Sequence, residues 1–393
     1  MRKTLIINAG SSSIKFKLYT MPGYSVDCEG IVDRIGLEMS SIVIEFNDEK
    51  VKKDLKIENH EFGIAKLLEM LEENNLISNK EEITKVGHRV VQGGEVFTES
   101  ILVGDKELKQ IFDLSKLAPL HNTPNGDGIK VFQKLLPNAQ NIAVFDTEFH
   151  QTMPEESYMY PVPYSWYTEF NVRRYGMHGT SHKYISTKLA KLENNDSLKI
   201  INCHLGNGAS ICAIDAGKSI HTSMGLTPLA GLMMGTRSGD IDPSIIEYMN
   251  KQTGMSIEEI TSKLNKESGM LGISGISSDF RDVEEAIDAG NERAILGMNI
   301  YVTRIIETIG AYYARLGGLD IISFTGGIGE NSNVVRREVL NGLSAFGLEI
   351  DEEVNSNRKL VKNNIVTTKN SKIKSWVLTT DEEYQIALEA EKF

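Results

Sequence analysis

The chain has 393 residues, and because single hydrophobic cores stop growing near roughly 250–300 residues, we expect two domains. Hydrophobic residues make up 40% and charged residues 24% of the sequence, which is typical of a soluble globular protein and excludes a membrane protein or a disordered chain. With 42 basic and 54 acidic residues the net charge is −12, so the long-range field disfavours nucleic acid and anionic lipid as partners.

The three cysteines, Cys28, Cys203 and Cys212, have neither paired nor metal-type spacing. An odd number in this arrangement argues against a disulfide framework and against a zinc site. The basic start at residues 2–3 is followed by only three apolar residues, too few for a secretory signal. We therefore expect a cytoplasmic protein.

The first 150 residues alternate between strand and helix patterns. Apolar residues 5–7 and the alternating residues 14–19 flank a polar turn at 8–13, which predicts a β-hairpin. Further strands are predicted at 42–46, 51–57, 86–90 and 142–145, and an amphipathic helix at 62–71. Prolines at Pro154, Pro161 and Pro163 predict an irregular domain boundary over 153–166.

The hairpin pattern returns at 199–215, with a glycine turn at 206–209, which suggests a duplicated unit. Helices are predicted at 182–192, capped by Ser181, at 243–249 and at 334–340. A long helix at 292–315 has one apolar stripe, made of Ile295, Met298, Val302, Ile305, Ile309 and Tyr312. A strand at 321–324 leads into a glycine turn at 326–331. This order predicts an α/β architecture with sheets flanked by helices.

Three glycine turns, at 8–13, 206–209 and 326–331, directly follow strands. Backbone N–H groups in such turns form anion-binding nests, although each turn could also be an ordinary tight turn. Polar residues suited to phosphate or magnesium stand beside them: Asn8, Ser11, Ser13, Lys15, Asn207, Glu330 and Asn331. Neither a P-loop nor a Rossmann fingerprint is present, so a nucleotide would be bound by hairpin turns.

Four further residues are candidates for chemistry. Arg89 ends a strand before a glycine turn and Arg237 lies between glycines, where a guanidinium can bind phosphate or carboxylate with two hydrogen bonds or simply be a surface charge. Asp146 ends another strand and His178 is bracketed by glycines; each is an acid–base candidate or a buried polar group. At this level the sequence predicts a two-domain phosphate-handling enzyme.

Ten segments, spread from Leu5 to Ala387, resemble the acetate kinase family. They read INAGSSSIKFKLY, HRVVQGGEVF, APLHNTPN, AVFDTEFHQTMP, RRYGMHGTSH, NCHLGNGAS, TSMGLTPLAGLMMGTRSGDIDP, ISGISSDFRD, FTGGIGENS and TDEEYQIA. The resemblance covers essentially the whole chain, and long motifs in matching order make it far more specific than any single glycine turn.

The resemblance implies an α/β fold of two duplicated ribonuclease H-like (actin-like ATPase) domains, with mixed sheets flanked by helices and a ligand cleft between them. Residues 1–150 plus 384–393 would form the first domain. Residues 151–383 would form the second, which would bind the nucleotide and join a homodimer.

The implied activity is reversible, Mg²⁺-dependent transfer of the γ-phosphoryl group of ATP to acetate by direct in-line displacement, giving acetyl phosphate and ADP; Mn²⁺ can substitute. One alternative is a kinase for propionate or another short-chain acid. An alternative of another class is a non-catalytic ATP-gated binding module, which is disfavoured because Arg89, Arg237 and His178 have no purpose in a mere nucleotide switch.

The resemblance also implies roles for individual residues. The catalytic group would be Asp146, Arg89, Arg237 and His178. The metal site would be Asn8 and Glu382. The nucleotide and its phosphates would be bound by Lys15, Ser11, Ser13, His204, Leu205, Gly206, Asn207, Gly208, Asp279, Phe280, Arg281, Gly326, Gly327, Ile328, Gly329 and Glu330. The substrate would be bound by Arg89, and its acyl methyl group would be lined by Val91, Leu120, Met177 and Pro228.

Two positions depart from the family pattern. Met177 stands where Phe is usual, and because methionine is flexible this pocket could tolerate propionate better. Asp381 stands where Asn is common, where it would either strengthen magnesium binding or face solvent. The family describes Asp146 as a proton donor and acceptor; because acetate is already ionised near neutral pH, we favour Asp146 as an orienting group.

Overall fold

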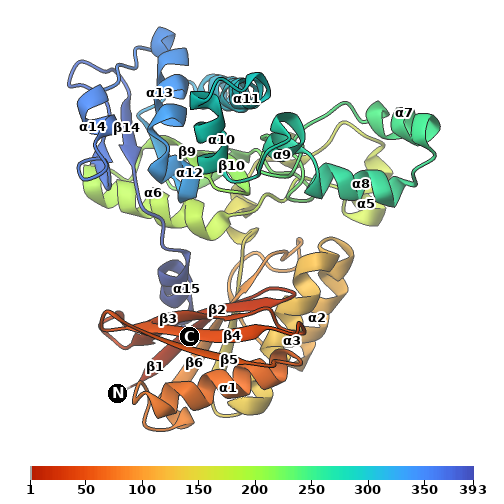
Figure 1. The fold of residues 1–393 in the computed structure, drawn as a ribbon, viewed down its shortest axis with the longest axis vertical. Helices are drawn as coiled ribbons and strands as arrows, with labels where there is room; N and C mark the ends of the chain where they lie inside the picture. Colours follow the sequence, from red (N-terminus) through yellow and green to blue (C-terminus); the bar gives the residue numbers. More distant parts are fainter. Residues whose placement is uncertain (1) are drawn as a thin grey trace. The chain divides into compact units, whose positions relative to one another are not determined.

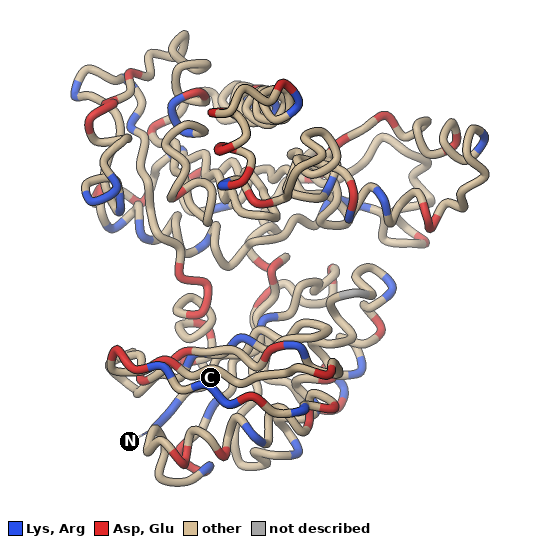
Figure 2. The backbone as a smooth tube through the Cα atoms, viewed as in Figure 1, with Lys and Arg blue, Asp and Glu red and all other residues tan. Residues whose placement is uncertain are grey.

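The computed structural model describes residues 2–393, apart from the side chain of Leu120. The chain forms two compact units, Met1–Gln151 with Asp381–Phe393, and Thr152–Thr380 (Figure 1). The return to the first unit occurs at Asp381 rather than at Tyr384, because Asp381 caps the last helix and pairs with Lys17 of the first unit at 3.5 Å. Acidic and basic residues are interspersed along both units (Figure 2).

The first unit is built on an eight-stranded mixed sheet with the order β5-β4-β3-β2-β1-β6-β8-β7. Its strands are β1 (Lys3–Ala9), β2 (Ser13–Thr20), β3 (Ser25–Asp33), β4 (Ser40–Phe46), β5 (Glu49–Leu55), β6 (Ile83–Val90), β7 (Ile101–Leu102) and β8 (Gln140–Phe145). Strands β1, β6 and β8 are parallel neighbours, whereas β1 to β5 form an antiparallel meander.

Helices cover both faces of this sheet. They are α1 (His60–Glu73), α2 (Asp105–Asp113), α3 (Pro119–Leu135) and α15 (Glu382–Ala390). Alternation along β1 divides its side chains between two cores: Leu5 and Ile7 pack into the core under α1 and α3, whereas Ile6 packs with Ile386 and Ala390 of α15. The last helix is therefore an integral layer of the first unit.

The second unit contains a six-stranded mixed sheet with the order β11-β10-β9-β12-β14-β13. Its strands are β9 (Lys199–Leu205), β10 (Ala209–Asp215), β11 (Lys218–Thr222), β12 (Ile321–Thr325), β13 (Asn364–Ile365) and β14 (Lys374–Val377). The hairpin β9–β10 lies beside the parallel strand β12, as β1–β2 lies beside β6. The repeated hairpin expected from the sequence is thus present. In each unit the first strand of the hairpin pairs with an equivalent parallel strand, β6 in the first unit and β12 in the second.

The helices of the second unit flank this sheet. They are α4 (Glu155–Tyr158), α5 (Tyr164–Phe170), α6 (Gly179–Glu193), α7 (Ser244–Thr253), α8 (Ile257–Lys266), α9 (Gly269–Ser274), α10 (Phe280–Asp288), α11 (Glu292–Leu316), α12 (Gly326–Asn331), α13 (Asn333–Gly342) and α14 (Glu352–Ser356). Figure 1 shows α6 and α11 on opposite sides of β9 and β10. None of the helices in residues 2–393 combines the length and hydrophobicity needed to cross a bilayer.

Several local expectations are wrong. The stretch 326–331 is the short helix α12 rather than an open turn, because Gly326 makes the turn alone with φ +78°. Helix α6 begins three residues before His182, and Ser181 lies inside it rather than at its cap. Ile295 is 38% exposed although it belongs to the predicted stripe of α11. The proline-rich segment 153–166 contains α4 and the start of α5.

Candidate functional site

The parallel strands of the first unit bring three predicted residues to one edge of the sheet. Because β1, β6 and β8 run in the same direction, their carboxyl ends meet at this edge, where α/β proteins commonly bind ligands. Ile6, Gly87 and Val144 contact or pack with α15. The residues two positions further along these strands are Asn8, Arg89 and Asp146. Side chains two apart share a face, so these three lie on the α15 face of the sheet.

The start of α15 is acidic (Figure 2). Glu382 is the first residue of α15 and interacts electrostatically with both Arg89 and Asp146. Lys15 stands opposite Asn8 in the β1–β2 register, so it reaches the same end of the sheet. Of the predicted serines in the turn, Ser13 is half-buried and Ser11 is exposed. Alternation along the strands thus brings Asn8, Arg89 and Asp146 to one face of the sheet.

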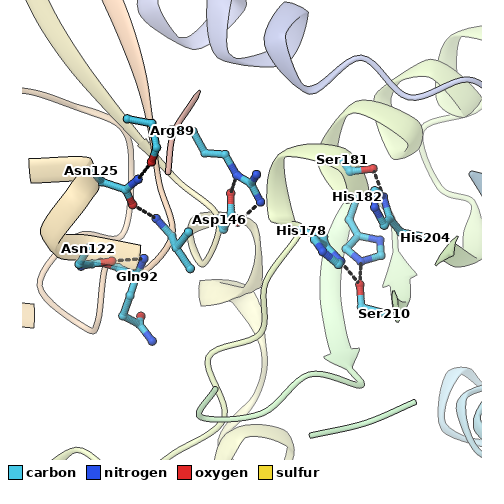
Figure 3. A network of polar contacts seen from close by, with 12 residues as sticks. Arg89, Gln92, Asn122, Asn125, Asp146, His178, Ser181, His182, His204 and Ser210 are labelled. Atoms are coloured by element: carbon cyan, nitrogen blue, oxygen red, sulfur yellow. Dashed lines mark hydrogen bonds and ion pairs between the residues drawn. The ribbon is translucent and has the colours of Figure 1, made fainter. Parts of the chain in front are cut away.

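Arg89 and Asp146 form a fork-shaped ion pair (Figure 3). Arg89 Nε donates to Asp146 Oδ1 at 2.9 Å and Nη2 donates to Oδ2 at 2.7 Å. Burial would lower the pKa of Arg89, but Asp146 and Glu382 outweigh that effect and raise it. Burial raises the pKa of the Asp146 carboxyl, and Arg89 opposes this rise. Asp146 is 1% exposed and the Arg89 side chain 21%, so the carboxylate fixes a guanidinium whose outer edge stays accessible.

Two carboxamides of α3 hold the strand ends that carry this pair, and no sequence pattern singled them out (Figure 3). Asn125 Nδ2 donates to the Ala9 carbonyl at 2.7 Å and Asn125 Oδ1 accepts from the Val91 N–H at 3.1 Å. Asn122 exchanges two hydrogen bonds with the Gln92 backbone, at 3.0 and 2.8 Å. Both asparagines lie in the APLHNTPN motif, which identified the segment but not these contacts.

His178 stands at the N-terminus of α6 with a left-handed φ of 58°. Its ring stacks on that of His204, with centroids 4.3 Å apart, and its Nδ1 lies 2.9 Å from Ser210 Oγ. Ser181, in the first turn of α6, has its Oγ 2.8 Å from His204 Nδ1. The histidines therefore belong to a polar cluster on the α6 face of β9 and β10, in which His182 and His204 are buried and His178 is half-buried (Figure 3).

Arg237 is a largely buried cation next to this cluster. Its Nη1 donates to the Pro228 carbonyl at 3.3 Å and contacts Met234 Sδ at 3.7 Å. Within residues 2–393 it has no carboxylate as a hydrogen-bond or ion-pair partner, and burial lowers its pKa. A Cβ placed on Gly208 would lie 3.3 Å from Arg237 Nη1 and 3.7 Å from His178 Nε2. Because a buried charge needs compensation, these groups are suited to receive an anion.

A pocket of about 860 Å³ lies within the second unit, a size typical of small-molecule sites. Eight of the predicted nucleotide-binding residues line it: Gly206, Asn207, Asp279, Phe280, Arg281, Gly327, Ile328 and Glu330. Five predicted residues of this unit are not among its lining: His204, Leu205, Gly208, Gly326 and Gly329. Leu205 is fully buried and Gly326 packs against its backbone, so these two support the pocket from beneath.

The pocket also contains cations that the sequence did not reveal. Arg336 is 1% exposed, and burial lowers its pKa to about 10. Its guanidinium donates to the Asn355 side chain at 2.9 Å and the Gly329 carbonyl at 2.9 Å. Arg358 and Lys362 line the same pocket. They come from segments without a glycine motif, so local pattern provided no signal for them.

Asp279 and Arg281, which line this pocket, stabilise the start of α10. Asp279 caps α10 by accepting from the Arg281 N–H at 2.9 Å. The hydrogen bonds from Arg281 lower the pKa of Asp279 to about 2. The carboxylate is therefore committed to Arg281 and to the helix terminus, and it remains ionised throughout the usual pH range.

The Asp381 side chain is 35% exposed, and its expected contribution to magnesium binding stays a prediction. Its Oδ1 accepts from the Tyr384 N–H at 2.9 Å and lies 3.5 Å from Lys17 Nζ. It is the N-cap of α15, a role that Asn also fills well. The Asn-to-Asp departure from the family pattern therefore preserves a helix cap.

The remaining predicted residues differ in their surroundings. Met177 is 2% exposed and Val91 8% exposed. Pro228 is half-buried, and its carbonyl accepts from Arg237. The Leu120 side chain lies outside the described part of the structure. Among the described residues no group of three or more His, Cys, Asp or Glu forms a protein-only metal site.

The comparisons with known proteins agree along the whole chain. The sequence model of the Acetokinase family matches residues 3–388. An acetate kinase of Geobacillus sp. (strain WCH70) is 51% identical over 389 residues, covering 98% of each chain. A crystal structure of Porphyromonas gingivalis acetate kinase has a TM-score of 0.95 and 41% identity, covering 100% of this chain and 99% of its own.

A propionate kinase from Francisella tularensis subsp. tularensis SCHU S4 is equally similar in structure, with a TM-score of 0.95, 40% identity and full coverage of both chains. The fold class expected from the sequence, two α/β units with mixed sheets flanked by helices, is confirmed by these structures. With a family match over nearly all residues and relatives near 50% identity, the chain belongs to the acetokinase family.

Proposed function

We propose that this chain is an acetate kinase, which transfers the γ-phosphoryl group of ATP to acetate and forms acetyl phosphate and ADP in a reversible reaction. One observation carries the proposal. Gly206 and Asn207 line the nucleotide-sized pocket, and the next residue, Gly208, lies against Arg237 and His178. One hairpin turn therefore connects a nucleotide pocket with a buried, uncompensated guanidinium.

The chemistry of phosphoryl transfer suits these residues. The transferred group carries negative charge on its equatorial oxygens, so an enzyme mainly has to position the reactants and neutralise charge. Arg237 would bind those oxygens, and its burial strengthens the interaction because less water competes for the charge. His178 would donate a hydrogen bond to the same group. Gly208 lacks a side chain, which leaves room for the phosphate beside both.

Arg89 is proposed to bind the carboxylate of acetate. Asp146 uses both of its oxygens to hold one edge of the Arg89 guanidinium, and the accessible remainder can form charge-assisted hydrogen bonds. Acetate is already ionised near neutral pH, so the reaction needs no general base. Asp146 is therefore assigned an orienting role, in which it fixes Arg89.

Asn8 and Glu382 are proposed to hold Mg²⁺, or Mn²⁺ in its place. They supply one amide and one carboxylate oxygen, which are suitable ligands, and their small number fits a cation that usually keeps several waters and binds the substrate phosphates. The cation would neutralise phosphate charge during transfer. Lys15 lies opposite Asn8 and would place a positive charge beside the phosphates. Ser11 and Ser13 would donate hydrogen bonds to the phosphate oxygens.

Propionate is the second candidate acceptor, because a propionate kinase matches this structure as well as an acetate kinase does. Met177 would lie at the acyl methyl group together with Val91, Leu120 and Pro228. A flexible Met side chain in place of Phe could leave room for one more methylene.

The test is a hydroxamate assay for acyl phosphate, with ATP, Mg²⁺ and either acetate, propionate or butyrate. We expect the highest kcat/KM with acetate. A clear preference for propionate would replace the substrate assignment but keep the kinase. No acyl phosphate above the blank with any acid would reject the kinase and favour an ATP-gated binding module. Omission of the divalent cation should abolish product formation.

We also propose that the second unit joins a homodimer. Large apolar side chains are exposed on several of its helices: Tyr164, Trp166, Phe170, Ile245, Tyr248, Ile257, Ile295 and Leu296. Exposed apolar side chains commonly mark interaction surfaces where they adjoin one another. Sedimentation equilibrium should give twice the chain mass, and Trp166→Glu with Tyr248→Glu should shift it toward the monomer. A monomeric wild-type protein would reject this assignment.

A further inference from the structure

A continuous chain of hydrogen bonds ends at His178. Ser323 Oγ lies 2.7 Å from Asn202 Oδ1, and Asn202 Nδ2 lies 2.9 Å from His182 Nδ1. His182 Nε2 lies 2.8 Å from Ser210 Oγ, which lies 2.9 Å from His178 Nδ1. The first four residues of the chain are fully buried. Figure 3 shows its last part, with both imidazoles directed at the Ser210 hydroxyl.

The chemistry of each group gives this chain one direction. The Ser323 hydroxyl donates to Asn202 Oδ1, so the Asn202 amide, which can only donate from Nδ2, donates to His182 Nδ1. A neutral imidazole that accepts at Nδ1 carries its proton on Nε2. His182 Nε2 therefore donates to Ser210 Oγ. The single hydroxyl hydrogen of Ser210 is left to donate to His178 Nδ1.

We propose that this relay fixes the tautomer of His178, so that neutral His178 accepts at Nδ1 and carries its proton on Nε2. Nε2 is the nitrogen that lies 3.7 Å from the Cβ position of Gly208, beside Arg237. Ser210, His182 and Asn202 are then positioning residues, which act on the reaction only through His178. Their role rests on the proposed function, in which His178 contacts the transferred phosphate.

A fixed tautomer of His178 would favour phosphoryl transfer. A fixed Nε2–H offers a hydrogen-bond donor to a phosphate oxygen without requiring His178 to become charged, and a preorganised donor needs no rearrangement in the transition state. The opposite tautomer would present a lone pair to a negatively charged oxygen, which is repulsive. The stacked ring of His204, with its centroid 4.3 Å away, limits rotation of the His178 ring and helps to keep Nε2 in place.

The tautomer can be observed directly in the wild-type protein. Long-range proton–nitrogen correlation spectra of ¹⁵N-histidine-labelled protein distinguish a protonated from an unprotonated ring nitrogen. His178→Gln assigns the His178 signals by their loss. Without any ligand, at a pH where the imidazole is neutral, we expect the proton on Nε2 of both His178 and His182. A proton on Nδ1 of His178, or a mixture of the two tautomers, would overturn the proposal.

Variants test whether Ser210 sets this state. Ser210→Ala should convert His178 to a tautomer mixture and lower kcat by about 10–100-fold, with little change in the KM for ATP. Ser210→Thr retains the hydroxyl and should restore the wild-type tautomer. The matched control is Ser375→Ala, since Ser375 is equally buried in the same sheet and its hydroxyl has no partner in the described structure.

The outcomes separate this proposal from the proposed function. An unchanged tautomer and rate in folded Ser210→Ala protein would reject the relay while the kinase remains. If Ser210→Ala does not fold, the wild-type spectrum still decides, because it requires no variant of the relay. A wild-type protein with the expected tautomer that forms no acyl phosphate would instead reject the kinase and leave the relay intact.

Discussion

At the scale of single residues, the two arginines predicted to act on the substrate differ in what neutralises them. Arg89 is held by both oxygens of Asp146, whereas Arg237 contacts a carbonyl and a thioether within the described structure. A guanidinium with a carboxylate partner is held in a fixed position, and its remaining edge would bind the proposed substrate. A guanidinium without one has its full charge available for a ligand, so the larger share of transition-state stabilisation is assigned to Arg237.

Arg237→Ala should therefore lower kcat by about 10³–10⁵-fold, the range found for arginines that stabilise phosphoryl transfer. The affinity for ADP, measured by calorimetry, should stay nearly intact, because Arg237 does not line the nucleotide pocket. Arg304→Ala, on the exposed surface of α11, is the matched control. A comparable loss of ADP affinity and kcat would place Arg237 at the nucleotide instead.

His88 makes stability depend on pH. Burial lowers the pKa of His88 from 6.5 to about 4, although its hydrogen bond with Asn141 opposes the shift. The unfolded chain therefore binds a proton that the folded protein does not between these pH values. The free energy of unfolding should fall as the pH drops from about 6.5 to about 4, by about 3 kcal/mol from this residue.

Urea unfolding at several pH values checks this prediction. His88→Gln keeps a side-chain N–H that can donate to Asn141, but the Gln side chain does not titrate. The free energy of unfolding of this variant should therefore fall less between pH 6.5 and pH 4 than that of the wild-type protein, by about 3 kcal/mol. If the free energy of unfolding depends on pH equally in the variant and in the wild-type protein, His88 is not buried in its neutral form.

At the scale of elements, the β9–β10 hairpin is the part of the fold on which the proposed chemistry depends most. Its turn runs from Gly206 to Gly208 and forms the hydrogen bond from Gly206 N–H to the Gly208 carbonyl at 3.1 Å. The first two residues of the turn line the pocket proposed for the nucleotide, and the third lies against Arg237 and His178. The absence of side chains at Gly206 and Gly208 lets backbone approach a phosphate closely.

Gly208→Ala should reduce kcat strongly while the protein stays folded. The new Cβ would lie 3.3 Å from Arg237 Nη1, so the guanidinium would have to shift and would occupy the phosphate position less well. Thermal unfolding should change little. Gly310→Ala in α11 is the control, because nothing lies within 4 Å of its Cβ position; it should keep full activity. Full activity in Gly208→Ala would contradict the role of this turn.

At the scale of the whole molecule, the chain divides into two units that carry different parts of the proposed site. The nucleotide pocket, Arg237 and His178 belong to Thr152–Thr380, whereas Arg89, Asp146, Asn8 and Glu382 belong to the other unit. The pocket proposed to bind the nucleoside of ATP is therefore lined by residues of the second unit alone.

ADP without acetate should accordingly protect the second unit from hydrogen exchange. Protection is expected in the pocket segments 278–284, 327–336 and 355–362, since ligand binding stabilises the native state that it selects. Segments of the first unit, such as β3 to β5, should exchange as before and serve as the internal control. Protection of β3 to β5 by ADP, without protection of the pocket segments, would refute this location of the nucleotide.

Much of this architecture could be predicted from local pattern. Period-two alternation and glycine turns located both hairpins, and the strand-end positions of Asn8, Arg89 and Asp146 followed from apolar runs that stop at a polar residue. Placing these three on one face also requires only the alternation of side chains along a strand. The family motifs then assigned functions that the alternation could not supply.

The tertiary structure alone decided which distant groups meet. Asn125 holds the Ala9 carbonyl 116 residues away. Arg336, Arg358 and Lys362 line the pocket proposed for the nucleotide, although they come from segments without a motif. Ser181 is a good helix cap by its type, but the left-handed φ of His178 starts the helix earlier. Sequence period determines which face a side chain occupies, because it is a property of neighbouring residues. The contacts across that face depend on how separate elements pack, which no local pattern records.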